Sequence, residues 1–71
     1  MYVEMHGEKV RELREEKGLA RRDLAAAAGI SLSTVNRLER ETPVSFRTAR
    51  RVILALGEEP SERGARVIRI S

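Results

Sequence analysis

Apolar positions recur at helical spacing in four stretches of the chain, and a glycine, a proline or a capping serine separates each stretch from the next. In the first stretch Val10 and Leu13 lie one turn apart, and every other position of residues 8–17 is charged. Gly18 follows directly, and glycine is common where a helix ends. The pattern predicts a first helix over residues 8–17.

A second, shorter helix is predicted over residues 21–28, with Leu24, Ala25 and Ala28 on its buried side. Small side chains let one helix cross another closely, so this alanine-rich stretch suits tight helix packing. Gly29 ends the helix and can adopt the positive φ that a sharp turn requires.

A third helix is predicted over residues 32–41, after Ser31, whose side chain is a good N-cap. Val35 and Leu38 are its inward positions, and Thr42–Pro43 ends it. The outward positions, most of them polar or charged, are Leu32, Ser33, Asn36, Arg37 and Arg40.

A fourth helix is predicted over residues 46–57, capped by Ser45. Arg47, Arg50 and Arg51 face away from the core. The apolar stripe of this helix consists of Phe46, Ala49, Val52, Ile53 and Leu56.

The two ends of the chain have a different pattern. Residues 65–70 alternate and are rich in β-branched side chains, which predicts a short strand, and residues 2–5 are a second candidate. We therefore expect one all-α domain over residues 1–71, with a four-helix core over residues 8–57, a tail over residues 58–71 and short strands at the termini.

Positive charge is concentrated in the middle of the chain. The net charge is +3, and residues 21–51 carry seven arginines against three acidic residues, whereas the segments on either side are close to neutral. Arginine binds phosphates and guanine edges through two parallel hydrogen bonds, so the cluster favours a nucleic-acid partner. Genome composition can explain why arginine outnumbers lysine, but it does not explain the clustering.

Several classes of site are not expected. The chain has no cysteine and a single histidine, His6, so neither a disulfide framework nor a metal cluster is expected. There is no nucleophile–base constellation or glycine-rich phosphate loop, and we therefore expect no enzyme activity and no cofactor. Without a signal peptide or an apolar run of roughly 18 residues, the expected location is the cytoplasm, on the nucleoid, with no membrane contact.

The second and third predicted helices form a helix-turn-helix arrangement: a helix, a glycine turn and a helix with outward polar groups. A resemblance to the phage repressor/Cro type, or xenobiotic-response-element family, lies in LREEKGLARRDLAAAAGISLSTVNRLERE. It runs without a gap from Val10 to Glu41, and more loosely to Leu56. The resemblance implies a lambda-repressor-like fold that binds double-stranded DNA, with the third helix in the major groove.

The resemblance also implies roles for individual residues. Arg14 and Glu39 correspond to an ion pair between the first helix and the recognition helix, although they can also be two separate surface charges. Base contacts are expected from Leu32, Ser33 and Arg37, for which packing or a solvated surface is the ordinary alternative. The residues expected to contact the DNA backbone are Arg21, Ser31, Thr34, Asn36, Arg40 and Arg47, the last from its place in the first turn of the fourth helix.

Three departures from the family pattern bear on these expectations. Ala20 replaces the usual Ser/Thr cap of the second helix, which loses roughly 1 kcal/mol of capping. The glycine that often follows Leu38–Glu39 is absent. The fifth helix, which often makes the dimer contact, is replaced by the predicted strand.

The function expected from the sequence is transcriptional regulation, by a repressor in preference to an activator, through sequence-specific DNA binding as a homodimer. In the dimer the tail strands of two subunits would pair, and the alternative is pairing of the tail with the N-terminus of its own chain. A different class also remains open: an antitoxin or adaptor module whose tail binds a protein partner.

Overall fold

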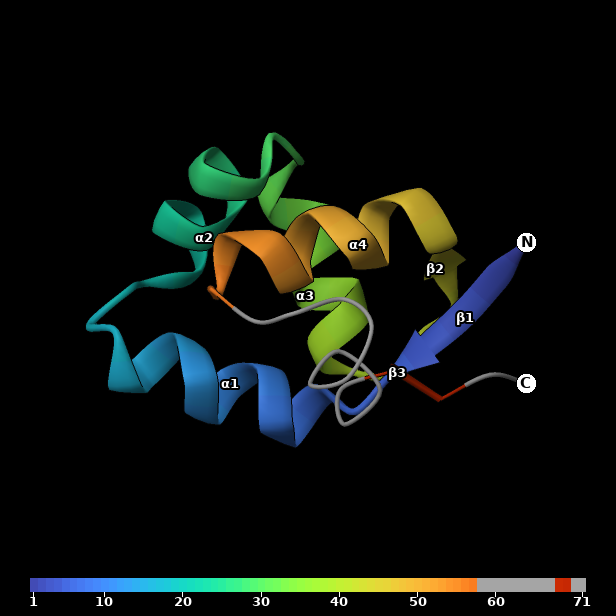
Figure 1. Ribbon diagram of the computed structural model, residues 1–71, viewed down its shortest axis with the longest axis horizontal. Coiled ribbons are helices and arrows are strands. Elements are labelled where there is room, and N and C mark those ends of the chain that lie inside the picture. The colour runs from blue at the N-terminus through green and yellow to red at the C-terminus, as the bar shows by residue number, and fades with distance from the viewer. Residues whose placement is uncertain (58–67, 70–71) are drawn as a thin grey trace.

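The computed structural model describes residues 1–57 and 68–69, in which four helices surround one apolar core and a small sheet lies at one end of them (Figure 1). The helices are α1 (Gly7–Glu16), α2 (Arg21–Ala28), α3 (Leu32–Glu39) and α4 (Phe46–Ala55). The strands are β1 (Tyr2–Met5), β2 (Val44–Ser45) and β3 (Ile68–Arg69). In the part of the chain that is described, no helix has the length and apolar character needed to cross a membrane.

All four predicted helices are present, and the expected serine caps begin two of them. The Ser31 hydroxyl accepts the backbone N–H of Thr34 at 3.1 Å, and the Ser45 hydroxyl accepts that of Thr48 at the same distance. Ala20 offers no cap, but the N–H of Ala20 donates to the Asp23 carboxylate at 2.8 Å, so one free backbone group at the start of α2 is satisfied.

The third helix is shorter than predicted, because α3 ends at Glu39 rather than at residue 41. Arg40 is its C-cap, and Glu41 then adopts φ 63°, the left-handed conformation that glycine adopts most readily. Glu41 therefore has the backbone conformation of a helix-ending glycine in a chain that lacks the glycine. The turn, and not Thr42–Pro43, ends the helix.

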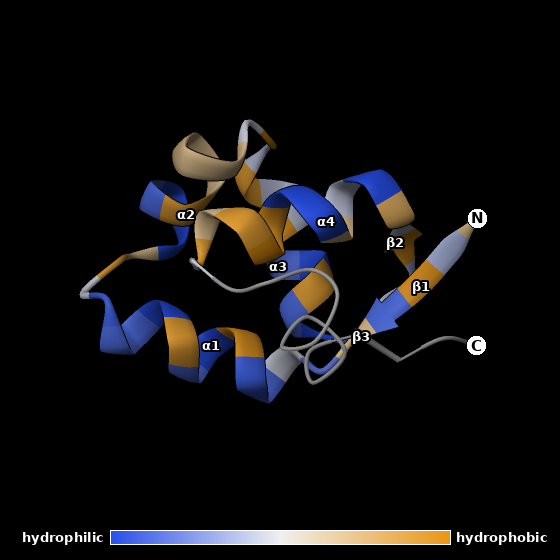
Figure 2. Ribbon diagram, in the orientation of Figure 1, coloured by the Kyte–Doolittle hydropathy of each residue, from blue (hydrophilic) through white to orange (hydrophobic). Residues whose placement is uncertain are grey.

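The core is formed by the inward faces of the helices and by two strands. Figure 2 shows apolar and hydrophilic segments alternating along the helices, as expected for helices with one buried face. The buried residues are Val3, Met5, Val10, Leu24, Ala25, Ala28, Val35, Leu38, Val44, Ala49, Val52, Ile53 and Leu56.

One predicted core residue is wrong: Phe46 is 44% exposed. It lies on the same side of α4 as Ala49 and Ile53, but at the first residue of the helix, beyond the end of the core. Val3 and Val44 are buried at this end, on strands that both contact α4. The sheet therefore fills the space that the helical periodicity assigned to Phe46.

The sheet has the strand order β2-β1-β3 with antiparallel pairing throughout, so β1 is the central strand. Tyr2 and Val3 pair with Ser45 and Val44, and β2 was not predicted from the sequence. On the other edge Met5 pairs with Ile68. The described part of the tail thus pairs with the N-terminal strand of its own chain, and residues 65–67 and 70 of the predicted strand lie outside the described residues.

Candidate nucleic-acid interface

The helix-turn-helix unit is held together by the inward faces of α2 and α3. Leu24 of α2 and Val35 and Leu38 of α3 are completely buried in one cluster. Between the helices Gly29 adopts φ 69°, and the N–H of Ile30 donates to the carbonyl of Ala25 at 3.0 Å. This turn fixes the direction in which α3 leaves α2.

Arg51 of α4 also contacts this turn: its Nη1 donates to the carbonyl of Gly29 at 3.4 Å. A cation is favourable here, because the carbonyl groups at the C-terminus of α2 carry partial negative charge. The sequence predicted Arg51 only as an outward-facing charge. Its contact with the turn depends on how α4 crosses α2, which periodicity along one helix does not reveal.

The predicted base-contacting residues lie together on the outer side of α3. Leu32 is 46% exposed although it is apolar, and Ser33 and Arg37 are exposed one turn apart. Within residues 1–57 and 68–69, no hydrogen bond or ion pair engages the side chain of Ser33 or Arg37. These three side chains are available to a ligand that approaches α3 from solvent.

Ser31 and Thr34 stand at the exposed start of α3, and their hydroxyls are 2.8 Å apart. Because both belong to the cap, they retain only part of their hydrogen-bonding capacity for a ligand. Arg47 is exposed in the first turn of α4, in a different element from the other predicted contacts.

Glu39 joins α3 to the two preceding helices. Its carboxylate accepts Arg14 Nε at 2.9 Å and Arg21 Nε at 3.2 Å. The side chains of Arg14 and Glu39 are 9% and 6% exposed, whereas that of Arg21 is 51% exposed. Arg14 also donates through Nη1 to the carbonyl of Leu19 at 2.8 Å. The implied ion pair thus belongs to a network that joins three helices, buried at Arg14 and Glu39 and exposed at Arg21.

Arg21, predicted as a phosphate contact, is thus also an ion-pair partner. Its bond to Glu39 uses Nε, and its two Nη groups make no hydrogen bond within the described residues. An arginine held in this way keeps a fixed direction while its outer nitrogens remain free to donate.

The end of α3 is packed against the start of α1. A Cβ added to Gly7 would meet the Glu39 backbone, with the carbonyl carbon 2.6 Å away. The N–H of Gly7 donates to Glu41 Oε2 at 3.1 Å. Sequence reasoning missed this contact, for which the signals were a glycine at the head of a helix and a glutamate where the family has glycine.

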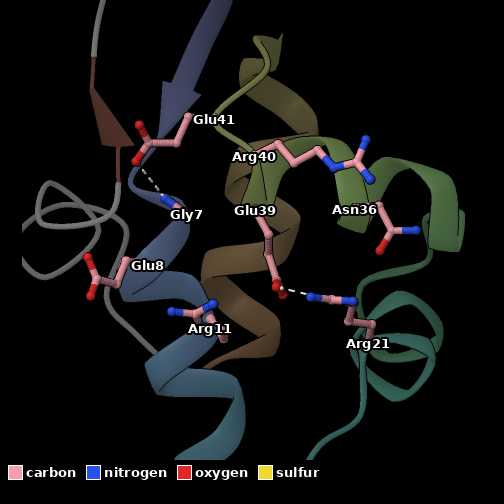
Figure 3. Close-up of a pocket in the computed structure, with 8 residues that line it drawn as sticks. All are labelled: Gly7, Glu8, Arg11, Arg21, Asn36, Glu39, Arg40 and Glu41. Carbon is pink, nitrogen blue, oxygen red and sulfur yellow. Dashed lines mark hydrogen bonds and ion pairs between the residues drawn. The ribbon is translucent and has the colours of Figure 1, made fainter.

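A polar hollow of about 580 Å³ lies beside this junction, between α1 and α3 (Figure 3). It is lined by Gly7, Glu8, Arg11, Arg21, Asn36, Glu39, Arg40 and Glu41. A shallower hollow of about 480 Å³ shares Arg21 and Asn36 with it and reaches Arg22 and Leu32. In the described part of the chain, no three histidine or acidic side chains are grouped as a metal site would require.

Comparison with known proteins agrees with this arrangement. A family model described as helix-turn-helix, of the Cro/C1 type, matches residues 10–63, which is well over half of the chain. Neither a curated protein nor a solved structure matches the chain significantly. The predicted resemblance is confirmed: the chain belongs to the Cro/C1-type helix-turn-helix family, a family of DNA-binding regulatory domains and not of enzymes.

Proposed function

We propose that this protein binds a specific sequence in double-stranded DNA by inserting α3 into the major groove, and that it regulates transcription. The observation that carries the proposal is the division of α3 into two sides. Val35 and Leu38 are buried in the core, while Leu32, Ser33 and Arg37 are exposed and approachable. A helix held rigidly by one side and open on the other is the element that reads base edges in this class of domain.

Each of the three exposed residues has a chemically suitable base partner. The guanidinium of Arg37 can donate two hydrogen bonds to O6 and N7 of one guanine. Leu32 can contact the methyl group of thymine, and the hydroxyl of Ser33 can both donate and accept. Repression needs only that a bound protein occupies the site, so we propose a repressor in preference to an activator.

The remaining polar residues lie on α3, at its two caps and in the first turns of α2 and α4, and their side chains suit contacts with the DNA backbone. Phosphate contacts orient a protein on the duplex without reading its sequence. We assign this role to Arg21, Ser31, Thr34, Asn36, Arg40 and Arg47.

The assignment of roles can be tested with two arginine variants and a pool of random duplexes. Arg37→Ala should lose roughly 1–3 kcal/mol for the preferred site and relax base preference at one position. Arg21→Ala should weaken binding to all sequences about equally and reduce the salt slope by about 1. The measurement is sequence selection followed by affinity titration at several salt concentrations.

Two results would count against the proposal. If both variants gave the same specificity profile, the division between base and backbone contacts would be wrong. If the wild-type protein bound all duplexes weakly but retained a protein partner in a pull-down that needs residues 58–71, the domain would be an adaptor or antitoxin.

We further propose that the protein binds DNA as a homodimer. One α3 covers only about half of a typical operator, and two-fold related subunits recognise a near-palindrome with one recognition helix in each half-site.

A further inference from the structure

The hollow between α1 and α3 is bordered by three guanidinium groups from three different elements. Arg11 belongs to α1, Arg21 to the start of α2, and Arg40 to the C-cap of α3. Figure 3 shows Arg11 and Arg21 on opposite sides of Glu39, and the side chain of Arg40 runs back along α3 toward Asn36. Only Arg21 and Arg40 lie in the segment that sequence reasoning connected with DNA.

The acidic residues of the hollow are largely engaged elsewhere. Glu39 is paired with Arg14 and Arg21, and the carboxylate of Glu41 accepts the N–H of Gly7 at the positive end of α1. Within the described residues, no hydrogen bond or ion pair engages the side chain of Arg11 or Arg40. In the described part of the chain, the hollow thus presents two guanidinium groups without an ion-pair partner, and the Glu8 carboxylate beside them is also unpaired.

Arg40 belongs to a stripe of residues along one flank of α3. Leu32, Asn36 and Arg40 are spaced by four residues, so they form one stripe along the helix next to the stripe of Ser33 and Arg37. The larger hollow contains the end of the first stripe, and the adjoining hollow contains its beginning. Arginines from α1, from α2 and from the C-cap of α3 border the two hollows along this flank of α3.

We propose that the larger hollow binds phosphate groups, and that Arg11 is a phosphate contact that α1 contributes from outside the helix-turn-helix unit. This inference rests on the proposed function, because a DNA strand that borders the groove entered by α3 runs along the flank of that helix. The arginines are spread around the hollow rather than pointed at one spot, which suits successive phosphates of a strand. A free phosphorylated compound has the same chemistry and is the other source of such groups.

Arg11 can be tested against Lys9, a matched cation on the same helix. Lys9 is paired with Glu12 at 3.7 Å and does not line the hollow. Arg11→Ala should weaken binding to every duplex about tenfold at physiological salt and reduce the salt slope by about 1. Lys9→Ala should change both quantities much less, and sequence preference should be the same in both variants.

A second pair of variants tests for stronger, rather than weaker, binding to duplex DNA. Glu8→Gln removes the unpaired carboxylate and should tighten binding severalfold, because repulsion of phosphate is relieved. Glu15→Gln, on an exposed part of α1 away from the hollow, is its control and should have little effect. Thermal melts of all four variants show whether the fold is retained.

The source of the phosphate is tested by titrating the full chain with inorganic tripolyphosphate while its amide resonances are followed. Shifts at Gly7, Arg11 and Arg40 that Arg11→Ala abolishes support phosphate binding from solution, and an effect confined to duplex affinity supports the DNA strand. Equal effects of Arg11→Ala and Lys9→Ala on DNA, together with no shift in tripolyphosphate, would overturn the inference. Failure of the wild type to bind any duplex would instead overturn the proposed function, and the tripolyphosphate titration would then decide the inference alone.

Discussion

Glu39 has two arginine partners whose surroundings differ sharply. Arg14 is almost as buried as Glu39 itself, whereas half of the Arg21 side chain is in contact with water. Charges removed from water interact more strongly, and leaving one of them without a partner is costly. The two ion pairs should therefore contribute very unequally to stability although they share one carboxylate.

We predict that Arg14→Met lowers the free energy of unfolding by about 3 kcal/mol, because Glu39 stays buried with only an exposed partner. Arg21→Met should lower it by less than about 1 kcal/mol, since an exposed ion pair is weakened by solvent. Denaturant titrations of the two variants and of Glu39→Ala provide the comparison. Additive effects below about 0.5 kcal/mol for Arg14→Met and Glu39→Ala would show that the buried pair does not stabilise the protein.

The sequence predicted part of this network. Arg14 and Glu39 each adjoin an apolar position, Leu13 and Leu38, which places them at the edge of the core on any helical model. The participation of Arg21 could not be predicted in the same way. It depends on the angle between α2 and α3, and a polar residue predicted to bind phosphate gives no sign of a second partner within the chain.

The helices themselves were predictable because their periodicity, caps and glycine stops agree with one another. The strand β2 was not, because two residues are too few to show alternation. The exposure of Phe46 has the same origin: periodicity assigns a residue to a face of a helix, but not to a position within or beyond the core. The position of Phe46 relative to the core can be predicted only once the pairing of β1 with β2 is known.

At the scale of the elements, the contact between α1 and α3 has no room for a side chain at Gly7. We predict that Gly7→Ala lowers the free energy of unfolding by more than about 2 kcal/mol, because the added methyl group meets backbone atoms of Glu39 that cannot rotate away. Gly18→Ala is the control: its φ of 69° disfavours alanine, but nothing lies within 4 Å. It should cost only about 1 kcal/mol.

The measurement is again denaturant unfolding, accompanied by amide exchange at the C-terminal end of α3. Faster exchange there in Gly7→Ala, and not in Gly18→Ala, would show that α1 supports the end of the recognition helix. Equal stabilities of the two variants would mean that the junction adjusts easily and that only backbone conformation matters.

At the scale of the whole molecule, the intrachain pairing of β3 changes where a second subunit is expected to bind. The exposed apolar residues Met1, Tyr2 and Phe46 are neighbours along the paired backbones, since the N–H of Phe46 donates to the carbonyl of Met1 at 2.9 Å and Tyr2 pairs with the adjacent Ser45. A two-fold axis through this surface brings identical apolar patches together, which is the self-complementary contact that a symmetric dimer requires.

We predict that the full chain has the mass of a dimer in light scattering at micromolar concentration, and that the double variant Tyr2→Ser, Phe46→Ser has the mass of a monomer. Deletion of residues 65–71 should leave the dimer intact, because the described part of this segment pairs within its own chain. If the deletion produced a monomer and the double variant remained a dimer, the dimer contact would lie in the tail. If the full chain were a monomer, neither the tail nor the surface around Tyr2 and Phe46 would be a dimer contact.

The central place of β1 in the sheet has a consequence for the order in which the protein folds. Only residues 29–31 separate α2 from α3, whereas Val3 must find Val44, about forty residues further along the chain. Closing the longer loop costs about 2 kcal/mol more in chain entropy, so the helix-turn-helix unit forms easily before the sheet does. During synthesis β1 leaves the ribosome before the other described elements, yet its partners on both edges are made long after it. The strand that precedes the four helices in the chain is therefore among the last elements to be held in place.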